Sequence, residues 1–401
     1  MSMPTIVGID PHKKAHSVCV LNERGRPIRE FEIGNSSADY QKLGNELSNG
    51  GGRTIIGLED TEQYGLNLAI YLSNLGLPVK VVNPIYTKRE RFYSPEISKD
   101  DRRDAELTAS VLWREFAKDN LPGFTNSTQA NFSRDLKGMI GDYRSLIHSQ
   151  TRLKNQLHQL LNMTYGNGYE QFFSSCFSST ALEFFFQFPS LNYFLKSRNE
   201  KWEKVVTSVS HYRLSNQLEH IKNLRGKLKK EGVMVSEMSH ITTQRLIRKI
   251  AELRFIQNQA KEVKGELAEM TSKNQQARSL MNLNGIGLIL ASIILSEIKD
   301  IHRFSRDSKL ASYSGCAPRK YGSGGKYKYY SNKRGNRKLN WAIHRMTLSQ
   351  LGNRGNKTTK DYYQKKLKLG KTKKQAFVAC KRQLIKVVYQ TLKKETSASN
   401  F

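Results

Sequence analysis

The chain has 401 residues and a formal net charge of +31, from 66 Lys and Arg against 35 Asp and Glu. This length predicts two or three domains, and so large a positive charge predicts a polyanionic partner, most often nucleic acid. Four widely spaced cysteines exclude a C-x-x-C zinc site. The longest apolar stretch, residues 286–295, is too short to span a bilayer, and with no signal-type segment we expect a cytoplasmic, nucleoid-associated protein with no membrane partner.

Residues 4–117 alternate strand and helix patterns. Three predicted strands are joined by connections too short for crossover helices, which indicates an antiparallel meander. Two further strands follow, each after a helix. This order is that of the RNase H-like fold, so we predict an α/β domain over residues 1–120. The predicted strands are residues 5–9, 16–21, 27–33, 54–58 and 77–82, and the predicted helices are residues 38–47, 64–75 and 101–118.

Four carboxylates lie at the ends of predicted strands or in the first turn of a predicted helix. Asp10 ends the first strand and Glu59 follows the fourth, while Asp101 and Asp104 lie at i and i+3 in the last helix, on one face. Acids in a first helical turn also cap the helix, but two on one face favour a site. Hard oxygen ligands select Mg²⁺, or Mn²⁺, so we predict that all four are catalytic metal ligands. His12 and His16 are expected to be structural or solvent-facing.

Residues 121–278 are almost free of proline and carry leucine and isoleucine at helical spacing. We predict long helices here, paired as a coiled coil. Within this region, residues 165–194 are rich in phenylalanine and tyrosine. Packing in a helical core is the favoured interpretation of these rings, and stacking on unpaired bases is the alternative.

Residues 279–401 form the third predicted domain, mostly helical and basic. A Gly-x-Gly turn before the helical run 288–298 leaves backbone N–H groups open to a phosphate. Beyond it, lysines and arginines alternate with tyrosines, as nucleic-acid surfaces require, and Asp361 is the one acid between Asp307 and Glu395. The predicted nucleic-acid-binding residues are Gly285, Gly287, Arg319, Lys320, Lys326, Lys328, Lys333, Arg334, Arg337 and Lys338.

Ser323 stands among glycines near these cations. Glycines allow close approach to a backbone, and the cations Arg319 and Lys326 would favour attack of its hydroxyl on phosphorus. The same Gly-Ser-Gly-Gly string is also typical of a flexible loop, and no general base is evident in the sequence. From the residues alone, both interpretations stay open.

The order of these motifs resembles the DEDD transposases of insertion sequences, which are similar to Piv-type DNA invertases and include recombinases guided by a bridge RNA. The resemblance covers residues 4–117 and 279–350. The motifs that carry it are Gly8-Ile-Asp10, Glu59, Lys99-Asp-Asp101-Arg-Arg-Asp104-Ala105, Gly285-Ile-Gly287, Ala311-Ser-Tyr-Ser-Gly315-Cys-Ala-Pro318, Ser323-Gly-Gly325 and Lys333-Arg-Gly-Asn336.

The resemblance implies a RuvC-like N-terminal domain whose tetrad is Asp10, Glu59, Asp101 and Asp104. It also implies a C-terminal transposase domain in which Ser323 forms a covalent phosphoserine–DNA intermediate. DNA, a guide RNA and a homodimer or tetramer are the implied partners. One departure is Asp100, which stands where the family has a small hydroxyl residue and could compete with Asp101 as a ligand.

Three hypotheses follow from the sequence. The first is an insertion-sequence transposase that uses the tetrad and Ser323. The second is a metal-dependent, junction-type endonuclease in which water attacks and Ser323 belongs to a DNA-binding loop. The third is an inert nucleic-acid-binding scaffold, which is disfavoured because gathering four like charges is costly without a cation.

Overall fold

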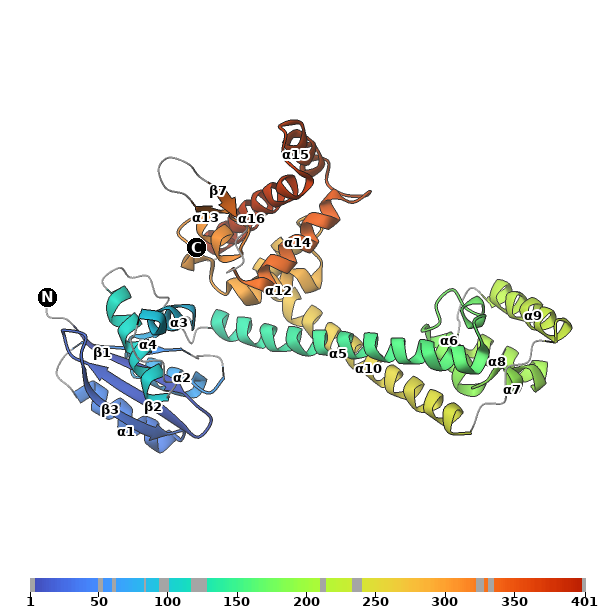
Figure 1. Cartoon of the computed structure of the whole chain (residues 1–401), viewed down its shortest axis with the longest axis horizontal. Coiled ribbons are helices and arrows are strands. Elements are labelled where there is room, and N and C mark those ends of the chain that lie inside the picture. The colour runs from blue at the N-terminus through green and yellow to red at the C-terminus, as the bar shows by residue number, and fades with distance from the viewer. Residues whose placement is uncertain are drawn as a thin grey trace. The chain divides into compact units, whose positions relative to one another are not determined.

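A computed structural model describes residues 4–49, 53–59, 63–82, 84–93, 101–116, 128–209, 214–232, 240–321, 328–330 and 335–398. The chain divides into two compact units. One contains residues 1–136 together with 293–401, and the other contains residues 137–292. Figure 1 shows the elements of each unit.

A five-stranded sheet with the order β3-β2-β1-β4-β5 forms the N-terminal part. β1, β2 and β3 pair antiparallel, whereas β4 lies parallel to β1 and β5 parallel to β4. This is the predicted meander followed by two crossover strands, so the RNase H-like fold class is confirmed. The strands are β1 (Thr5–Pro11), β2 (Ala15–Leu21), β3 (Pro27–Gly34), β4 (Thr54–Leu58) and β5 (Val79–Val81).

Helices cover both faces of this sheet. On one face, α1 (Ser37–Asn49) and α2 (Leu66–Asn74) bury leucines against alternate residues of β1, β2 and β4. On the other, α4 (Asp101–Phe116) packs on the remaining alternate residues, which include Ile6 and Ile55. Side chains alternate along a strand, and both faces are apolar here, which explains the continuous hydrophobic runs. The sequence prediction missed α3 (Pro84–Tyr93), a basic helix that begins with proline at its first position.

Two long helices dominate the second unit: α5 (Thr128–Tyr165), which begins just before it, and α10 (His240–Ser272). They share a core through leucines of both helices, such as Leu157 and Leu253, and the Gln150 side chain donates to the Ile256 carbonyl oxygen at 3.5 Å. The predicted long helices are therefore confirmed (Figure 1). Shorter elements complete this unit: a 3-10 turn (Tyr169–Gln171), α6 (Ser179–Gln187), α7 (Leu191–Lys196), α8 (Asn199–Val209), α9 (Leu214–Lys230) and α11 (Gln275–Met281).

The phenylalanine-rich segment forms the interior of that unit, and the core interpretation of it is confirmed. The rings of Phe172, Phe184 and Phe194 are buried and lie edge-on or tilted against one another, with centroids 5.0–5.7 Å apart. Such arrangements suit the aromatic quadrupole. These buried faces have no room for a base, so base stacking is wrong for them.

The C-terminal part is helical and basic, as predicted. α12 (Leu288–Ile298) has the predicted bounds, and α13 (Asp307–Tyr313) follows it. The basic tail forms two helices, and Gly370, at a φ of 76°, lies between them. A short antiparallel hairpin was not predicted. The remaining elements are a 3-10 turn (Ile301–Arg303), β6 (Arg319–Tyr321), β7 (Lys328–Tyr330), α14 (Arg337–Leu351), α15 (Lys357–Lys368) and α16 (Lys373–Ala398).

All four cysteines are described, buried and free of disulfide bonds. Across the described ranges, no helix combines the length and the hydropathy needed to cross a membrane.

Candidate functional site

Neighbouring strands bring Asp10 and Glu59 to the same edge of the sheet. β1 and β4 pair in parallel with Ile9 opposite Leu58, so Asp10 and Glu59 are the next residues on the two strands. Because side chains alternate along a strand, Asp10 shares a face with Ile6 and Gly8, which is the face that α4 covers. The sheet therefore presents two carboxylates to the helix that carries Asp101 and Asp104.

Glycine allows α4 to come close to this face. A Cβ at position 8 would overlap the Ala105 carbonyl oxygen and the backbone nitrogen of Ala109. Ala105 and Ala109 are themselves small and fully buried. Helix and strand backbones are thus in direct contact just beside Asp104, which places that acid at the edge where Asp10 and Glu59 lie.

The pKa of the Glu59 carboxyl is affected by the neighbouring acids. Burial raises the pKa of the Glu59 carboxyl, and the nearby charges of Asp10 and Asp104 raise it further. A hydrogen bond with the Thr87 side chain and the charge of Arg91 act in the opposite direction on this pKa. Carboxylates from three separate elements therefore influence one another at this edge of the sheet, and their role as metal ligands stays a prediction.

Two basic side chains partner these acids. His12 Nε2 lies 3.1 Å from Asp10 Oδ2 at a site where the Asp10 side chain is only 14% exposed. Arg91, from α3, forms an ion pair with Asp104. Sequence reasoning did not single out Arg91, because the helix that presents it was itself missed. Its signal was the basic string Lys88-Arg-Glu-Arg91 two turns after Pro84.

The fourth predicted ligand is placed only in part. Asp101 begins α4, but its side chain is outside the described residues, as is the whole of Asp100. Among the side chains that are described, no three His, Cys, Asp or Glu groups stand close enough together to hold a metal ion. In this arrangement Asp104 is engaged by Arg91 instead.

His16 has a structural role, as expected. It is fully buried, its Nδ1 accepts the His12 backbone N–H at 3.3 Å, and its ring stacks on Tyr40. Burial lowers the pKa of His16, so the ring is neutral near pH 7. This keeps the β1–β2 turn, and with it His12, in place.

The predicted nucleic-acid surface is described in part. Gly285 has a φ of 81°, a conformation that favours glycine, and the turn it forms leads through the exposed Gly287 into α12. Arg337 and Lys338 are exposed in the first turn of α14. Arg319, Lys320 and Lys328 lie on β6 and β7 with side chains outside the described residues, and Ser323, Lys326, Lys333 and Arg334 fall outside the description entirely.

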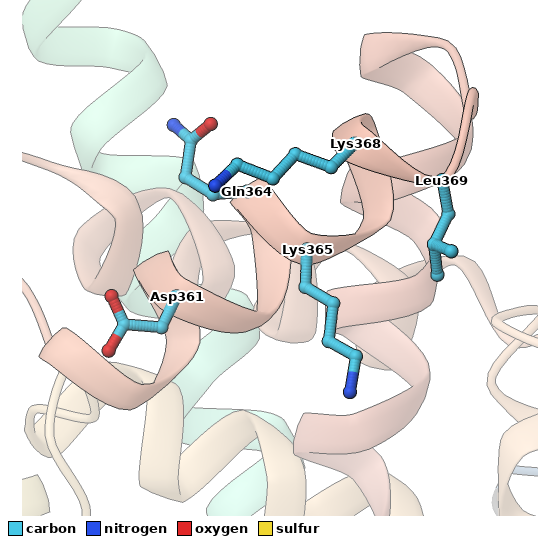
Figure 2. Close-up of a pocket in the computed structure, with 5 residues that line it drawn as sticks. All are labelled: Asp361, Gln364, Lys365, Lys368 and Leu369. Carbon is cyan, nitrogen blue, oxygen red and sulfur yellow. The ribbon is translucent and has the colours of Figure 1, made fainter.

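A shallow hollow of about 410 Å³ lies along α15. Figure 2 shows its lining residues, Asp361, Gln364, Lys365, Lys368 and Leu369, along α15 and just past its end. No residue of α15 is buried, and three lysines occupy its last turn. One acid among lysines is a poor metal site, whereas an exposed basic helix suits phosphates. The sequence predicted a basic surface in this region but did not single out Gln364, Lys365, Lys368 or Leu369.

Two family models match the chain. A transposase model designated DEDD_Tnp_IS110 matches residues 7–165, and a model described as the transposase IS116/IS110/IS902 family matches residues 277–364. The chain is similar to the insertion element IS110 uncharacterized 43.6 kDa protein of Streptomyces coelicolor, with 20% identity over 97% of this chain and 94% of the relative.

Two solved structures from Thermus thermophilus also match, RuvC in complex with a Holliday junction substrate and RuvC by itself. Their identities are 11% and 13%, and each match covers 30% of this chain and 100% or 99% of the RuvC chain, with a TM-score of 0.24. The strand order, rather than this superposition, carries the assignment of the fold.

Proposed function

This chain belongs to the IS110 family of DEDD transposases, and we propose that it cuts and exchanges DNA strands for an insertion element with two sets of residues. Residues 1–120 would supply a carboxylate metal site, residues 279–401 a nucleophilic serine on a basic surface, and residues 121–278 the helical connection. The observation that carries the proposal is the parallel pairing of β1 with β4, which brings Asp10 and Glu59 side by side at the sheet edge next to α4 and Asp104.

The donor set fits a hard divalent cation. Asp10, Glu59, Asp101 and Asp104 offer only carboxylate oxygens, which Mg²⁺ and Mn²⁺ prefer. Burial raises the pKa of Glu59, the charges of Asp10 and Asp104 raise it further, and a bound cation would favour the ionised carboxylate. When bound, Mg²⁺ would stabilise the charge on the attacking and leaving oxygens of a phosphodiester.

His12 and Arg91 are the basic partners of the acids at this site. Arg91 forms an ion pair with Asp104, so a cation at this site would compete with Arg91 for that carboxylate. The freed guanidinium is then available to a DNA phosphate, which it can bind through two parallel hydrogen bonds. His12 orients Asp10 through its Nε2.

Ser323 is the proposed nucleophile. Its Oγ–phosphorus bond would form as the bond from phosphorus to the leaving strand oxygen breaks, and the hydroxyl proton would pass to that oxygen. The reverse reaction on a second strand then rejoins DNA without loss of bond energy. The family resemblance supports this assignment, together with the glycines on both sides of Ser323.

The basic C-terminal part would bind the DNA. The exposed Arg337 and Lys338, and the lysines of α15, are described residues suited to phosphates. A guide RNA and assembly into a dimer or tetramer, in which carboxylates and serine come from different protomers, are part of this proposal. Both rest on the family resemblance.

The test is to trap the protein–DNA adduct on a labelled fragment that contains the ends of the element. We expect wild type to form the adduct in Mg²⁺, Ser323→Ala to form none, and Asp10→Asn to form none although it still binds DNA. An adduct that persists in Ser323→Ala would mean that the nucleophile is another residue.

A junction-type endonuclease is the second candidate, favoured by the fact that its chemistry needs only the acids of the N-terminal part. In that case water attacks and no adduct forms. Cleavage would then survive Ser323→Ala and would still be lost in Asp10→Asn. The two substitutions therefore separate the two functions.

A further inference from the structure

The two ends of the segment 315–335, which includes β6 and β7, cross each other in direct backbone contact. A Cβ at Gly335 would overlap the backbone nitrogen and Cα of Gly315. Gly315 itself has a φ of 70°. Beside this crossing, the Asn336 backbone N–H donates to the Tyr313 carbonyl oxygen at 2.7 Å. The segment thus leaves and re-enters the domain at one point.

A buried acid fixes one side of this crossing. Glu297, at the end of α12, is 7% exposed, and its Oε2 accepts the Asn336 side-chain amide at 2.6 Å. The same amide nitrogen lies 3.2 Å from the Tyr313 hydroxyl, which donates to the Glu297 carbonyl oxygen at 3.3 Å. Asn336 Oδ1 caps α14 by accepting the Leu339 backbone N–H at 2.9 Å.

A buried base fixes the other side. Lys381, on α16, is 7% exposed, and its Nζ donates to Asn340 Oδ1 at 2.7 Å. Asn340 then donates through its side-chain nitrogen to the Ser314 carbonyl oxygen at 2.7 Å. Among the described residues Lys381 has no carboxylate within ion-pair distance, and burial lowers the pKa of its ammonium group.

The two charges determine which way each asparagine faces. An amide has a donor end and an acceptor end. A carboxylate accepts only, so Glu297 attracts the nitrogen of Asn336 and leaves its oxygen for the helix cap. An ammonium group donates only, so Lys381 attracts the oxygen of Asn340 and leaves its nitrogen for the Ser314 carbonyl group. Neutral partners of the same shape would not impose this choice.

Burying an ammonium group without an acid partner is costly, and so is leaving a carboxylate oxygen short of donors. Glu297 Oε1 has no hydrogen bond among the described residues, and Lys338 Nζ is 3.8 Å from it. These two unfavourable buried groups, Lys381 and Glu297, both lie beside the ends of the segment 315–335. That coincidence is difficult to explain by stability alone.

We propose that Glu297 and Lys381 are positioning residues for DNA cleavage, which through Asn336 and Asn340 fix the backbone on both sides of the segment 315–335. This inference rests on the proposed role of Ser323, which lies in that segment. Neither residue touches DNA in this scheme. They fix the described backbone at residues 313–315 and 335–336, from which the part of the chain that carries Ser323 extends.

The decisive variant is Asn336→Ser in the full-length protein. Serine still caps a helix, so α14 is retained, whereas the contact with Glu297 is lost. We expect adduct formation at saturating labelled element DNA to slow by about tenfold to a hundredfold, the scale of a small misplacement at a reacting centre. The Kd for DNA, measured by filter binding at fixed salt, should be unchanged. Glu297→Gln, which keeps an acceptor oxygen and removes the charge, should slow the same step.

Asn356→Ser is the matched control. Asn356 caps α15 by accepting the Thr359 backbone N–H at 3.2 Å, and the same substitution there leaves both buried charges in place. The proposal is overturned if the two Asn→Ser variants form the adduct at equal rates. It is also overturned if Asn336→Ser loses DNA binding and thermal stability in step with its rate, since that is a purely structural role.

A second measurement separates this inference from the proposed function. Amide hydrogen exchange of β6 and β7 should be faster in Asn336→Ser than in Asn356→Ser, whatever the nucleophile is. If wild type forms no adduct, the serine mechanism fails. Faster exchange in Asn336→Ser would still show that the contact between Asn336 and Glu297 fixes the backbone of β6 and β7. Equal exchange rates in the two variants would show that the contact between Asn336 and Glu297 does not fix this backbone.

Discussion

Gly8 of β1 lies directly against the Ala105 backbone of α4, at the point where the sheet and the acid-bearing helix meet. Adding a methyl group at Gly8 forces the helix away from the sheet, because the two nearest atoms, the Ala105 carbonyl oxygen and the Ala109 nitrogen, belong to the helix backbone. We predict that Gly8→Ala destabilises the protein by about 1–3 kcal/mol, the usual cost of overpacking a core. It should also weaken metal binding, since Asp104 moves with the helix. Chemical denaturation and calorimetric titration with MgCl₂ measure the two effects.

Gly138→Ala is the control for that substitution. Gly138 lies in α5 with open space where its Cβ would be, and alanine is the better helix former by roughly 0.5–1 kcal/mol. This variant should therefore be slightly stabilised and should bind metal normally. Normal metal binding by a folded Gly8→Ala protein would show that the helix contact does not position Asp104.

The raised pKa of Glu59 predicts that this carboxyl, a proposed metal ligand, lowers the stability of the metal-free protein at neutral pH. Between the unfolded pKa and the higher folded pKa, the folded protein binds more protons than the unfolded chain. The contribution of Glu59 to stability is thus fully present below its unfolded pKa and is lost as pH rises through its folded pKa. At neutral pH in EDTA, Glu59→Gln should be more stable than wild type, and the difference should shrink on acidification towards pH ~4.5.

Thermal unfolding across a pH series in EDTA provides the measurement. Excess Mg²⁺ should raise the melting temperature of wild type, because a ligand that binds the folded state stabilises it, and should have less effect on Glu59→Gln. If the variant is no more stable than wild type at neutral pH, burial and the neighbouring acids do not raise the pKa of Glu59, and the metal-site proposal loses one of its supports.

Arg91 competes with the cation for Asp104. At pH 8 in low salt, Arg91→Gln removes a positive charge from the site and should tighten Mn²⁺ binding several-fold in a calorimetric titration. Arg29→Gln is the matched control, because Arg29 pairs with Glu46 on an exposed surface. Weaker Mn²⁺ binding in Arg91→Gln alone would mean that Arg91 organises the ligands instead of competing with the metal.

Local patterns were enough to predict the N-terminal sheet and the acids on it. Asp10 and Glu59 each follow an apolar run typical of a strand, and Asp101 and Asp104 are spaced i, i+3 as on one face of a helix. Both patterns can be recognised in the sequence. Arg91 was not predictable in the same way. Its role depends on α3, whose mixed charges hide any amphipathic period, and on a long-range approach to Asp104.

Glu297 and Lys381 illustrate a second limit. Glu297 follows the apolar run of α12 and Lys381 stands among other cations of α16, and neither sequence context indicates which side chain each one contacts. Their significance comes from Asn336 and Asn340, which lie one helical turn apart on α14 and contact opposite charges on two other helices. Contacts of this kind appear only once the tertiary fold is known.

The aromatic core of the second unit yields the last prediction. Phe184 is fully buried, and its ring lies 5.0 Å from that of Phe194, centroid to centroid. Phe184→Ala should cost about 3–5 kcal/mol, the usual cost of truncating a buried aromatic residue, and should leave DNA affinity unchanged at temperatures where the unit is folded. Tyr193→Ala, at a ring that is 55% exposed, should cost far less. If a folded Phe184→Ala protein bound single-stranded DNA more weakly than Tyr193→Ala, these rings would contact bases, contrary to their burial.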